Sequence, residues 1–423
     1  MLTRSRSFLP VLGRALSVLL IALGLSCAAF AQQPPLRIGF GMSLTGPLAG
    51  NGKAALIAME IWREDVNAKG GILGRKVEFI YYDDQTNPST VPGLYTKLLD
   101  VDKVDLVVSG YGTAVIAPAM PLMMQRNMAF MTLFGLNVNS KFNYERYFQI
   151  MPAGPQPAIG WTRGFFEAAM SLNPKPKTVA LVGADAEYPH MALEGARSHV
   201  ERLGLKVVYD KTYPPNTVDY SPIVRAIQAT NPDLVYLASY PPDSAGMVRA
   251  VNEVGLKTRM FGGGLVGTQF AALKTQLGPL LNGVVNYELY APELSGKFPF
   301  LDDFLAKYQG RAAKEGVDPL GYYLPPYAYA MMQVVQQALE GTKSLDQDKL
   351  ATYIHTHTFD TFVGKVSFAK NGEWAEPRVM MVQYKGITGN GIDQWKKTGA
   401  VTVLEPGPYK TGSVKTPFQD AKN

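Results

Sequence analysis

Residues 36–84 read LRIGFGMSLTGPLAGNGKAALIAMEIWREDVNAKGGILGRKVEFIYYDD and decide the fold of this chain. The apolar run 36–42 is typical of a buried strand, and residues 53–68 carry apolar side chains at the spacing of one helical face. A glycine pair ends this helix, and a second strand is expected over 75–82. Strand, helix and strand in this order predict a βαβ unit with two neighbouring parallel strands.

The loop between the first strand and the helix is the first candidate ligand-contacting element. In an open α/β sheet, ligands bind at the carboxyl ends of the strands, which is where residues 43–47 lie. A phosphate-binding loop is excluded, because Pro47 stands where that motif needs glycine and Ala54 where it needs a hydroxyl. We interpret the loop as a way to bring backbone N–H groups close to a ligand at a helix start.

The first 31 residues have the features of a secretory signal peptide. Three arginines precede the short apolar run 16–25, and residues 29–31 have the small-x-small form of a cleavage site. We expect cleavage after Ala31. Cys27 leaves lipid attachment as an alternative, although the residues before it fit that signal poorly.

Composition after removal of this segment excludes several classes of protein. Cys27 is the only cysteine, so no disulfide is available, but about 390 residues suffice for two ordinary domains. The remaining 38 basic and 35 acidic residues give a net charge of +3. That charge is too near neutral to favour nucleic acid or an anionic membrane as a partner.

The two halves of the chain are expected to have the same order of strands and helices. Residues 104–111 and 232–240 are similar strands, each followed by a tyrosine-containing turn, and each comes third in its half. Prolines at 152, 155 and 157 mark a boundary between the halves. We therefore predict an α/β protein with two similar doubly wound parallel-sheet lobes. A late antiparallel pair is expected from residues 362–368 and 378–384.

The chain resembles periplasmic solute-binding proteins of the leucine/isoleucine/valine-binding type, the receptor components of ABC importers. The resemblance covers nearly the whole chain after residue 31. It is carried by Ile38-Gly39, residues 43–49, Asn67-Ala68-Lys69-Gly70-Gly71-Ile72-Leu73-Gly74-Arg75, Asp83-Asp84, residues 251–257 and Tyr327-Ala328-Tyr329.

The resemblance implies two lobes joined by three hinge segments, here near 152, 285 and 360, with the ligand cleft between them. Closure about such hinges encloses the ligand. The expected division is a signal peptide at 1–31, lobe I at 32–152 plus 286–359, lobe II at 153–285 plus 360–405, and a C-terminal tail at 406–423.

The resemblance also implies site residues, transferred one at a time. Asn51 falls on a first-loop position of the cleft, Thr113 on a hydroxyl that holds the ligand carboxylate, and Tyr188 and Tyr240 on the second-lobe positions that close over the ligand. Two transfers fail. Leu136 lacks the second carboxylate-binding hydroxyl, and Gly264 lacks the acid that holds an α-ammonium. Because a buried ammonium without a paired acid is costly, we expect a ligand other than an α-amino acid.

Aromatic residues are expected around the cleft instead, and aromatic walls suit a flat or apolar ligand. The hypothesis is a small aromatic or otherwise apolar organic acid. Each tyrosine also has a packing interpretation, above all Tyr327, which lies on a long apolar helix. The predicted ligand-binding residues are Asn51, Tyr111, Gly112, Thr113, Phe134, Gly135, Tyr188, Tyr240, Gly264 and Tyr327.

The function expected from these observations is a periplasmic receptor that hands its ligand to ABC permease subunits in the inner membrane. We expect a monomer with no cofactor, no metal and no nucleic-acid partner, and not an enzyme. His355 and His357 are interpreted as surface residues rather than metal ligands. The alternatives are a ligand-sensing module of a signalling system, or a binder of branched-chain amino acids or amides.

Overall fold

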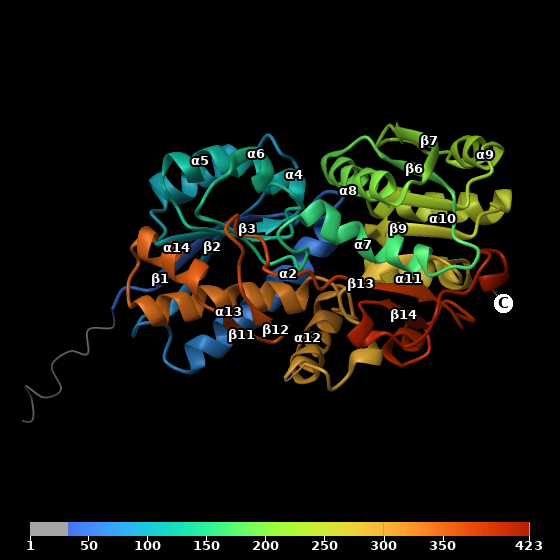
Figure 1. Ribbon diagram of the computed structural model, residues 1–423. Helices are drawn as coiled ribbons and strands as arrows, with labels where there is room; N and C mark the ends of the chain where they lie inside the picture. The colour runs from blue at the N-terminus through green and yellow to red at the C-terminus, as the bar shows by residue number, and fades with distance from the viewer. Residues whose placement is uncertain (1–32, 299, 423) are drawn as a thin grey trace, which may run out of the picture.

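The computed structural model describes residues 33–298 and 300–422 and contains two α/β lobes (Figure 1). The expected signal peptide, its cleavage site after Ala31 and Cys27 lie outside the described residues. Within the described part of the chain, no helix combines the length and the apolar character needed to cross a bilayer.

Lobe I is built on a five-stranded sheet in the order β2-β1-β3-β4-β5, with every neighbouring pair parallel. Helices α2 and α13 pack against each other beside this sheet, and α12 packs against both. The strands are β1 (Leu36–Met42), β2 (Val77–Asp83), β3 (Leu106–Tyr111), β4 (Phe130–Leu133) and β5 (Tyr147–Gln149). The helices are α2 (Ala49–Ala68), α3 (Val91–Thr96), α4 (Thr113–Ile116), α5 (Met120–Gln125), α6 (Asn139–Phe142), α12 (Leu301–Glu315), α13 (Pro325–Thr342) and α14 (Gln347–Thr356).

Lobe II is built on a seven-stranded sheet in the order β14-β13-β10-β9-β8-β6-β7. Strands β13 and β14 add to it in antiparallel fashion, while the other pairs are parallel. The strands are β6 (Thr178–Ala184), β7 (Lys206–Tyr213), β8 (Leu234–Ser239), β9 (Met260–Leu265), β10 (Val285–Glu288), β13 (Met380–Tyr384) and β14 (Val401–Glu405). The helices are α7 (Pro157–Met170), α8 (Glu187–Leu203), α9 (Ser221–Ala229), α10 (Pro241–Val254) and α11 (Ala271–Leu277).

The two lobes share one strand order, which confirms the prediction of two similar parallel-sheet lobes. In each, the second, first, third, fourth and fifth strands of the lobe lie side by side. An aspartate side chain accepts a backbone hydrogen bond at the start of the sheet in both lobes. Asp105 accepts a hydrogen bond from the Arg37 N–H at 2.8 Å, and Asp233 accepts one from the Thr178 N–H at 3.0 Å. Each carboxylate joins the start of its lobe's first strand to that of the third.

The chain passes between the lobes three times, after β5, between β10 and α12, and between β12 and β13. The expected late antiparallel pair is wrong. Strand β12 (Gly364–Val366) pairs with β11 (Phe359–Thr361) near α13, whereas β13 pairs with β10 and β14 in lobe II. The local sequence pattern predicted the extended segments, but the strands with which they pair are determined by the packing of the two lobes.

The conspicuous acids and glycines of the first βαβ unit shape the backbone. The Ser43 hydroxyl donates to Asp84 at 2.6 Å and the Thr45 hydroxyl donates to Asp83 at 2.7 Å, which fastens the β1–α2 loop to the end of β2. A Cβ on Gly52 would lie 1.9 Å from the Ser43 carbonyl oxygen. Only glycine therefore allows the start of α2 to approach the loop this closely.

The C-terminal segment packs on lobe II. The Phe418 side chain is buried, its ring centroid lies 5.4 Å from that of Phe261, and its N–H donates to the Thr258 carbonyl at 3.0 Å. Residues beyond 406 thus cover part of the second sheet instead of hanging free.

Candidate functional site

A group of tyrosines lies where the carboxyl ends of the two sheets meet. We call Tyr111, Tyr188, Tyr240, Tyr287 and Tyr323 the tyrosine cluster. Tyr111 ends β3, Tyr188 lies in the first turn of α8, and Tyr240 precedes α10. Tyr287 is in β10, and Tyr323 is in the segment before α13. In sheets of this strand order, ligands bind at such carboxyl ends, where the order of the strands reverses.

Hydrogen bonds and ring contacts connect the tyrosine cluster across the lobes. The Tyr111 and Tyr323 hydroxyls are 3.2 Å apart, and the ring centroids of Tyr287 and Tyr323 are 6.2 Å apart. Tyr188 donates from its hydroxyl to the Gly264 carbonyl at 3.0 Å, and its ring lies 5.7 Å from that of Tyr240. Rings from both sheets and from a connecting segment therefore share one interior space.

The hydroxyls of this cluster are uncharged donors at neutral pH. Burial raises the pKa of Tyr111, Tyr188 and Tyr287 well above the usual value near 10. Among the described residues, no carboxylate is hydrogen-bonded to a hydroxyl of the cluster. The site thus offers O–H and N–H donors in aromatic surroundings.

The predicted aromatic residues Phe134 and Tyr327 lie beside the tyrosine cluster. The Phe134 ring centroid is 5.4 Å from that of Tyr323 and 5.3 Å from that of Tyr327. Gln149 fixes this turn, because its side-chain carbonyl accepts from the Phe134 N–H at 2.8 Å and its amide donates to the Gly135 carbonyl at 3.1 Å. Phe134 and Tyr327 therefore support Tyr323 from the lobe I side.

Thr113 and Leu136, two positions transferred from the resemblance, are neighbours in space. The Thr113 hydroxyl oxygen accepts a hydrogen bond from the Leu136 N–H at 3.1 Å. Gly112 directly precedes this threonine with a φ of 110°, a conformation that favours glycine. The O–H proton of Thr113 remains available as a donor, since the hydroxyl carries one donor and two acceptor positions.

Gly264 lies directly under two tyrosine hydroxyls. A Cβ at this position would be 3.0 Å from the Tyr236 hydroxyl oxygen and 3.2 Å from that of Tyr188. Any larger side chain here would displace one of them. The Gly264 carbonyl itself is engaged by Tyr188, so backbone and hydroxyl occupy the space around Cα.

Three residues of the site escaped prediction from sequence, namely Tyr287, Tyr323 and Trp161. Trp161 in α7 donates from Nε1 to the Tyr188 hydroxyl at 3.3 Å, and its ring centroid is 4.4 Å from that of Tyr287. Tyr287 belongs to β10, whose sequence Val285-Asn286-Tyr287-Glu288 has no marked pattern although all four residues are buried. The one usable signal was the pair Tyr322-Tyr323 just before a proline-initiated helix.

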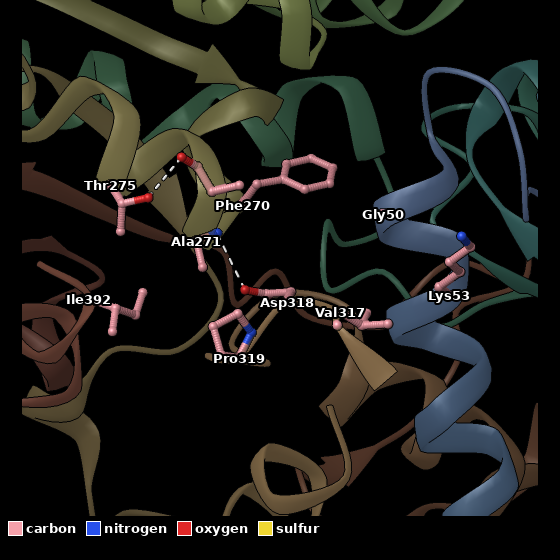
Figure 2. A pocket seen from close by; sticks show the side chains of 11 residues that line it. Gly50, Lys53, Phe270, Ala271, Thr275, Val317, Asp318, Pro319 and Ile392 are labelled. Carbon is pink, nitrogen blue, oxygen red and sulfur yellow. Dashed lines mark hydrogen bonds between the residues drawn. The ribbon is translucent and has the colours of Figure 1, made fainter. Parts of the chain in front are cut away.

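The lobes touch at the rim of this region. Lys141 and Glu187 form an ion pair at 2.8 Å, and a Cβ on Gly50 would lie 2.9 Å from the Phe270 ring. Beside this contact is a pocket of about 500 Å³ between the start of α2 and helix α11. Figure 2 shows the Phe270 ring pointing toward the part of α2 that carries Gly50 and Lys53.

A much smaller cavity continues inward from this pocket. Its volume is about 10 Å³, and it shares Gly50, Phe270 and Asp318 with the outer pocket. Asn51, Gln269 and Tyr323 also line it, so it reaches the tyrosine cluster. The outer pocket and the inner cavity therefore mark a path from the surface to the cluster along the Phe270 side.

Comparison with known proteins identifies the family. The family model described as "Periplasmic binding protein" matches residues 35–391. The chain belongs to the periplasmic binding protein family.

This periplasmic binding protein is similar in sequence and in structure to several proteins that are named for the ligands they bind. A Leu/Ile/Val-binding protein of Citrobacter freundii is 24% identical over 411 residues, which cover 92% of this chain and 98% of that protein. A leucine-binding protein structure from Thermotoga maritima has a TM-score of 0.71 at 19% identity and covers 87% and 97% of the two chains. A solute-binding protein of an ABC transporter from Rhodopseudomonas palustris, in complex with 3,4-dihydroxybenzoic acid, has a TM-score of 0.68 at 19% identity and covers 84% and 94%. These likenesses establish the shared two-lobed fold.

Proposed function

We propose that this periplasmic binding protein captures a small carboxylic acid with an aromatic or apolar body and presents it to an ABC importer. The observation that carries the proposal is the tyrosine cluster, which supplies flat apolar surfaces and protonated hydroxyls at the ends of both sheets. Aromatic side chains with a few directed polar groups are the usual lining of sites for such ligands.

The negative charge of the ligand has an electrostatic complement. Helices α2, α8 and α10 begin at the cluster, with Asn51 and Tyr188 in first turns and Tyr240 preceding the first residue. Helix N-termini attract anions because their N–H groups are unpaired and carry the positive end of the helix dipole. Hydrogen bonds from tyrosine hydroxyls to a carboxylate are stronger than neutral ones.

An α-amino acid fits this environment less well, because its ammonium needs an acceptor with negative charge. At Gly264, where the resemblance implies that acid, the space is filled by the hydroxyls of Tyr188 and Tyr236. An unpaired buried ammonium would be strongly disfavoured. The dihydroxybenzoic acid bound by the Rhodopseudomonas palustris protein supports an aromatic acid as a ligand class for this fold.

A branched-chain amino acid is the second candidate. It is favoured by the Citrobacter freundii relative, a Leu/Ile/Val-binding protein that aligns over almost its whole length. We propose that either ligand would be enclosed by movement about the three connecting segments, with binding selecting the closed form. The membrane partner would then be ABC permease subunits, and the protein would act as a monomer in the periplasm.

A thermal-shift screen of the purified protein tests the proposal. The compounds are aromatic acids, short fatty acids, amides and the twenty amino acids. A ligand at a hundred times its Kd stabilises the folded state by about 2.7 kcal/mol, so it should raise the melting temperature well above that seen with compounds that do not bind. The largest shift should come from an aromatic or apolar acid that is recovered unchanged. Leucine or valine giving the largest shift would favour the second candidate, and a converted compound would indicate an enzyme.

A further inference from the structure

Two residues that line the small inner cavity, Asn51 and Gln269, each carry a buried amide atom without a partner. Asn51 Nδ2 and Gln269 Oε1 make no hydrogen bond within the part of the chain that the structure describes. Their residues are only 3% and 4% exposed, and both line the cavity of about 10 Å³ next to Tyr323. A buried polar atom left unpaired destabilises the folded protein, so two of them at one cavity need an explanation.

The orientation of the Gln269 amide is fixed by its other end. Gln269 Nε2 donates to the Tyr287 carbonyl at 2.7 Å, which leaves Oε1 as the unpaired acceptor. Asn51 contributes the opposite function, an N–H donor from the first turn of α2 in lobe I. Gln269 comes from the turn before α11 in lobe II. The donor and the acceptor therefore come from different lobes, and their residues line one cavity.

The other polar groups of the cavity are already engaged. Asp318 Oδ1 accepts from the Ala271 and Leu320 N–H groups, each at 3.3 Å, and its Oδ2 accepts from the Gly321 N–H at 3.1 Å. The Tyr323 hydroxyl pairs with that of Tyr111. An additional oxygen atom in the cavity would therefore find Asn51 and Gln269 as its partners.

The chemistry of this pair selects a particular group. A carboxylate only accepts hydrogen bonds and would leave Gln269 Oε1 unpaired, whereas an ammonium only donates and would leave Asn51 Nδ2 unpaired. A hydroxyl accepts from one and donates to the other. The volume of the cavity is close to the space needed for one oxygen-sized group.

We propose that Asn51 and Gln269 form a donor–acceptor pair that recognises a hydroxyl group of the ligand, which makes the ligand a hydroxylated aromatic acid. This inference rests on the proposed function and narrows its ligand class. Both lobes would then contribute to recognition of the hydroxyl, since it is fully paired only when closure brings Asn51 and Gln269 together.

Isothermal titration of the purified protein with benzoate and its three monohydroxy isomers tests the pair. At least one isomer should bind ten or more times as tightly as benzoate, because its hydroxyl would pair both buried atoms, each worth about fivefold or more in affinity. Asn51→Ala and Gln269→Met should each reduce that ratio at least threefold, because each removes one of the two partners of the hydroxyl. Gln276→Met, at an exposed position of α11, is the matched control and should keep the full ratio.

The outcomes separate this inference from the proposed function. If aromatic acids bind but benzoate equals every hydroxylated isomer, the pair recognises no ligand hydroxyl and the cavity holds only water. A preference that persists in both Asn51→Ala and Gln269→Met would equally overturn the inference. If an apolar acid binds in the thermal-shift screen and no aromatic acid does, the inference fails while the proposed function stands. If neither kind of acid binds the unmodified protein, both fail. Should Gln269→Met not fold, judged by its circular dichroism, Asn51→Ala carries the decision alone.

Discussion

The Tyr188 hydroxyl donates a hydrogen bond to the Gly264 carbonyl over 3.0 Å. This bond connects the first turn of α8 to β9 and fills the space that an acidic side chain at position 264 would need. In this chain a tyrosine ring and a backbone carbonyl thus occupy the region where the resemblance implies an anionic anchor. The ligand preference that we propose depends on this replacement.

Loss of the Tyr188 ring should weaken ligand binding more than it affects folding. Tyr188→Ala removes a wall of the cluster and its contacts with Tyr240 and Trp161, so we expect at least a tenfold rise in the Kd of the best acid found by screening. Thr113→Ala should also weaken binding, because it removes a hydroxyl donor near the chain turn at Leu136. Titration calorimetry gives the Kd, and circular dichroism checks the fold. Unchanged affinity in both variants would mean that the ligand does not bind at this site.

The Phe270 ring should slow ligand release. It lies against Gly50 across the lobe boundary, beside the pocket that leads inward. Phe270→Ala should therefore raise the dissociation rate at least severalfold while changing the association rate less, as most interface changes do. Stopped-flow fluorescence measures both rates. Phe300→Ala is the control, because that ring is 71% exposed on the α12 side of lobe I. Equal dissociation rates in the two variants would contradict a closing role for Phe270.

Removing one partner of the buried ion pair between Lys274 and Glu288 should lower the free energy of unfolding. Lys274 Nζ lies 2.7 Å from Glu288 Oε1, the same oxygen accepts from the Tyr384 hydroxyl at 2.6 Å, and both charged side chains are at most 4% exposed. Lys274→Met leaves a buried carboxylate without its cation and should lower the free energy of unfolding by about 3–5 kcal/mol. The double variant Lys274→Met/Glu288→Gln should recover part of that loss. Urea denaturation measures the difference, and a loss under 1 kcal/mol for Lys274→Met would refute the prediction.

Asp243 should make the stability of lobe II depend on pH. Burial raises the pKa of Asp243 to about 6, although the Tyr213 hydroxyl, which donates to it at 2.6 Å, opposes the rise. Because the folded-state pKa lies above the unfolded value of 3.8, the contribution of Asp243 to stability is fully present below pH 3.8 and is lost as the pH rises through about 6.

Asp243→Asn should therefore stabilise the protein at pH 7.5, by up to about 3 kcal/mol, and change little at pH 4. Urea denaturation at the two pH values measures the effect. Glu376→Gln, at an exposed position, is the control and should give no pH-dependent difference. A variant that is less stable than the unmodified protein at pH 7.5 would mean that the Tyr213 bond outweighs the cost of burying the charge.

Local sequence patterns predicted the repeated strand and helix order because each element carries its own periodicity. The run 36–42 is a strand and the helix face beginning at Ala54 is buried, as expected, although the helix begins at Ala49 rather than at residue 53. The equivalent positions of Asp105 and Asp233 follow from the like order of the lobes. The partner of Met380–Tyr384 could not be predicted this way, because strand pairing depends on residues about a hundred positions apart.

The candidate site was predictable only where it follows strand ends. Tyr111 is the last residue of β3, and Tyr188 and Tyr240 follow soon after β6 and β8, where a tyrosine stands out from the apolar pattern. Tyr287 lies within a buried strand, and Gln269 lies in a short turn with no marked pattern. Their roles depend on which lobe faces them, and that information is absent from local sequence.

The most direct test of the account is a calorimetric titration of the purified protein with benzoate, its hydroxylated isomers and L-leucine under the same conditions. We expect an aromatic acid to bind at least tenfold more tightly than L-leucine, because the cluster offers uncharged donors and aromatic walls without an acid for an ammonium. Tighter binding of L-leucine than of every aromatic acid would contradict it.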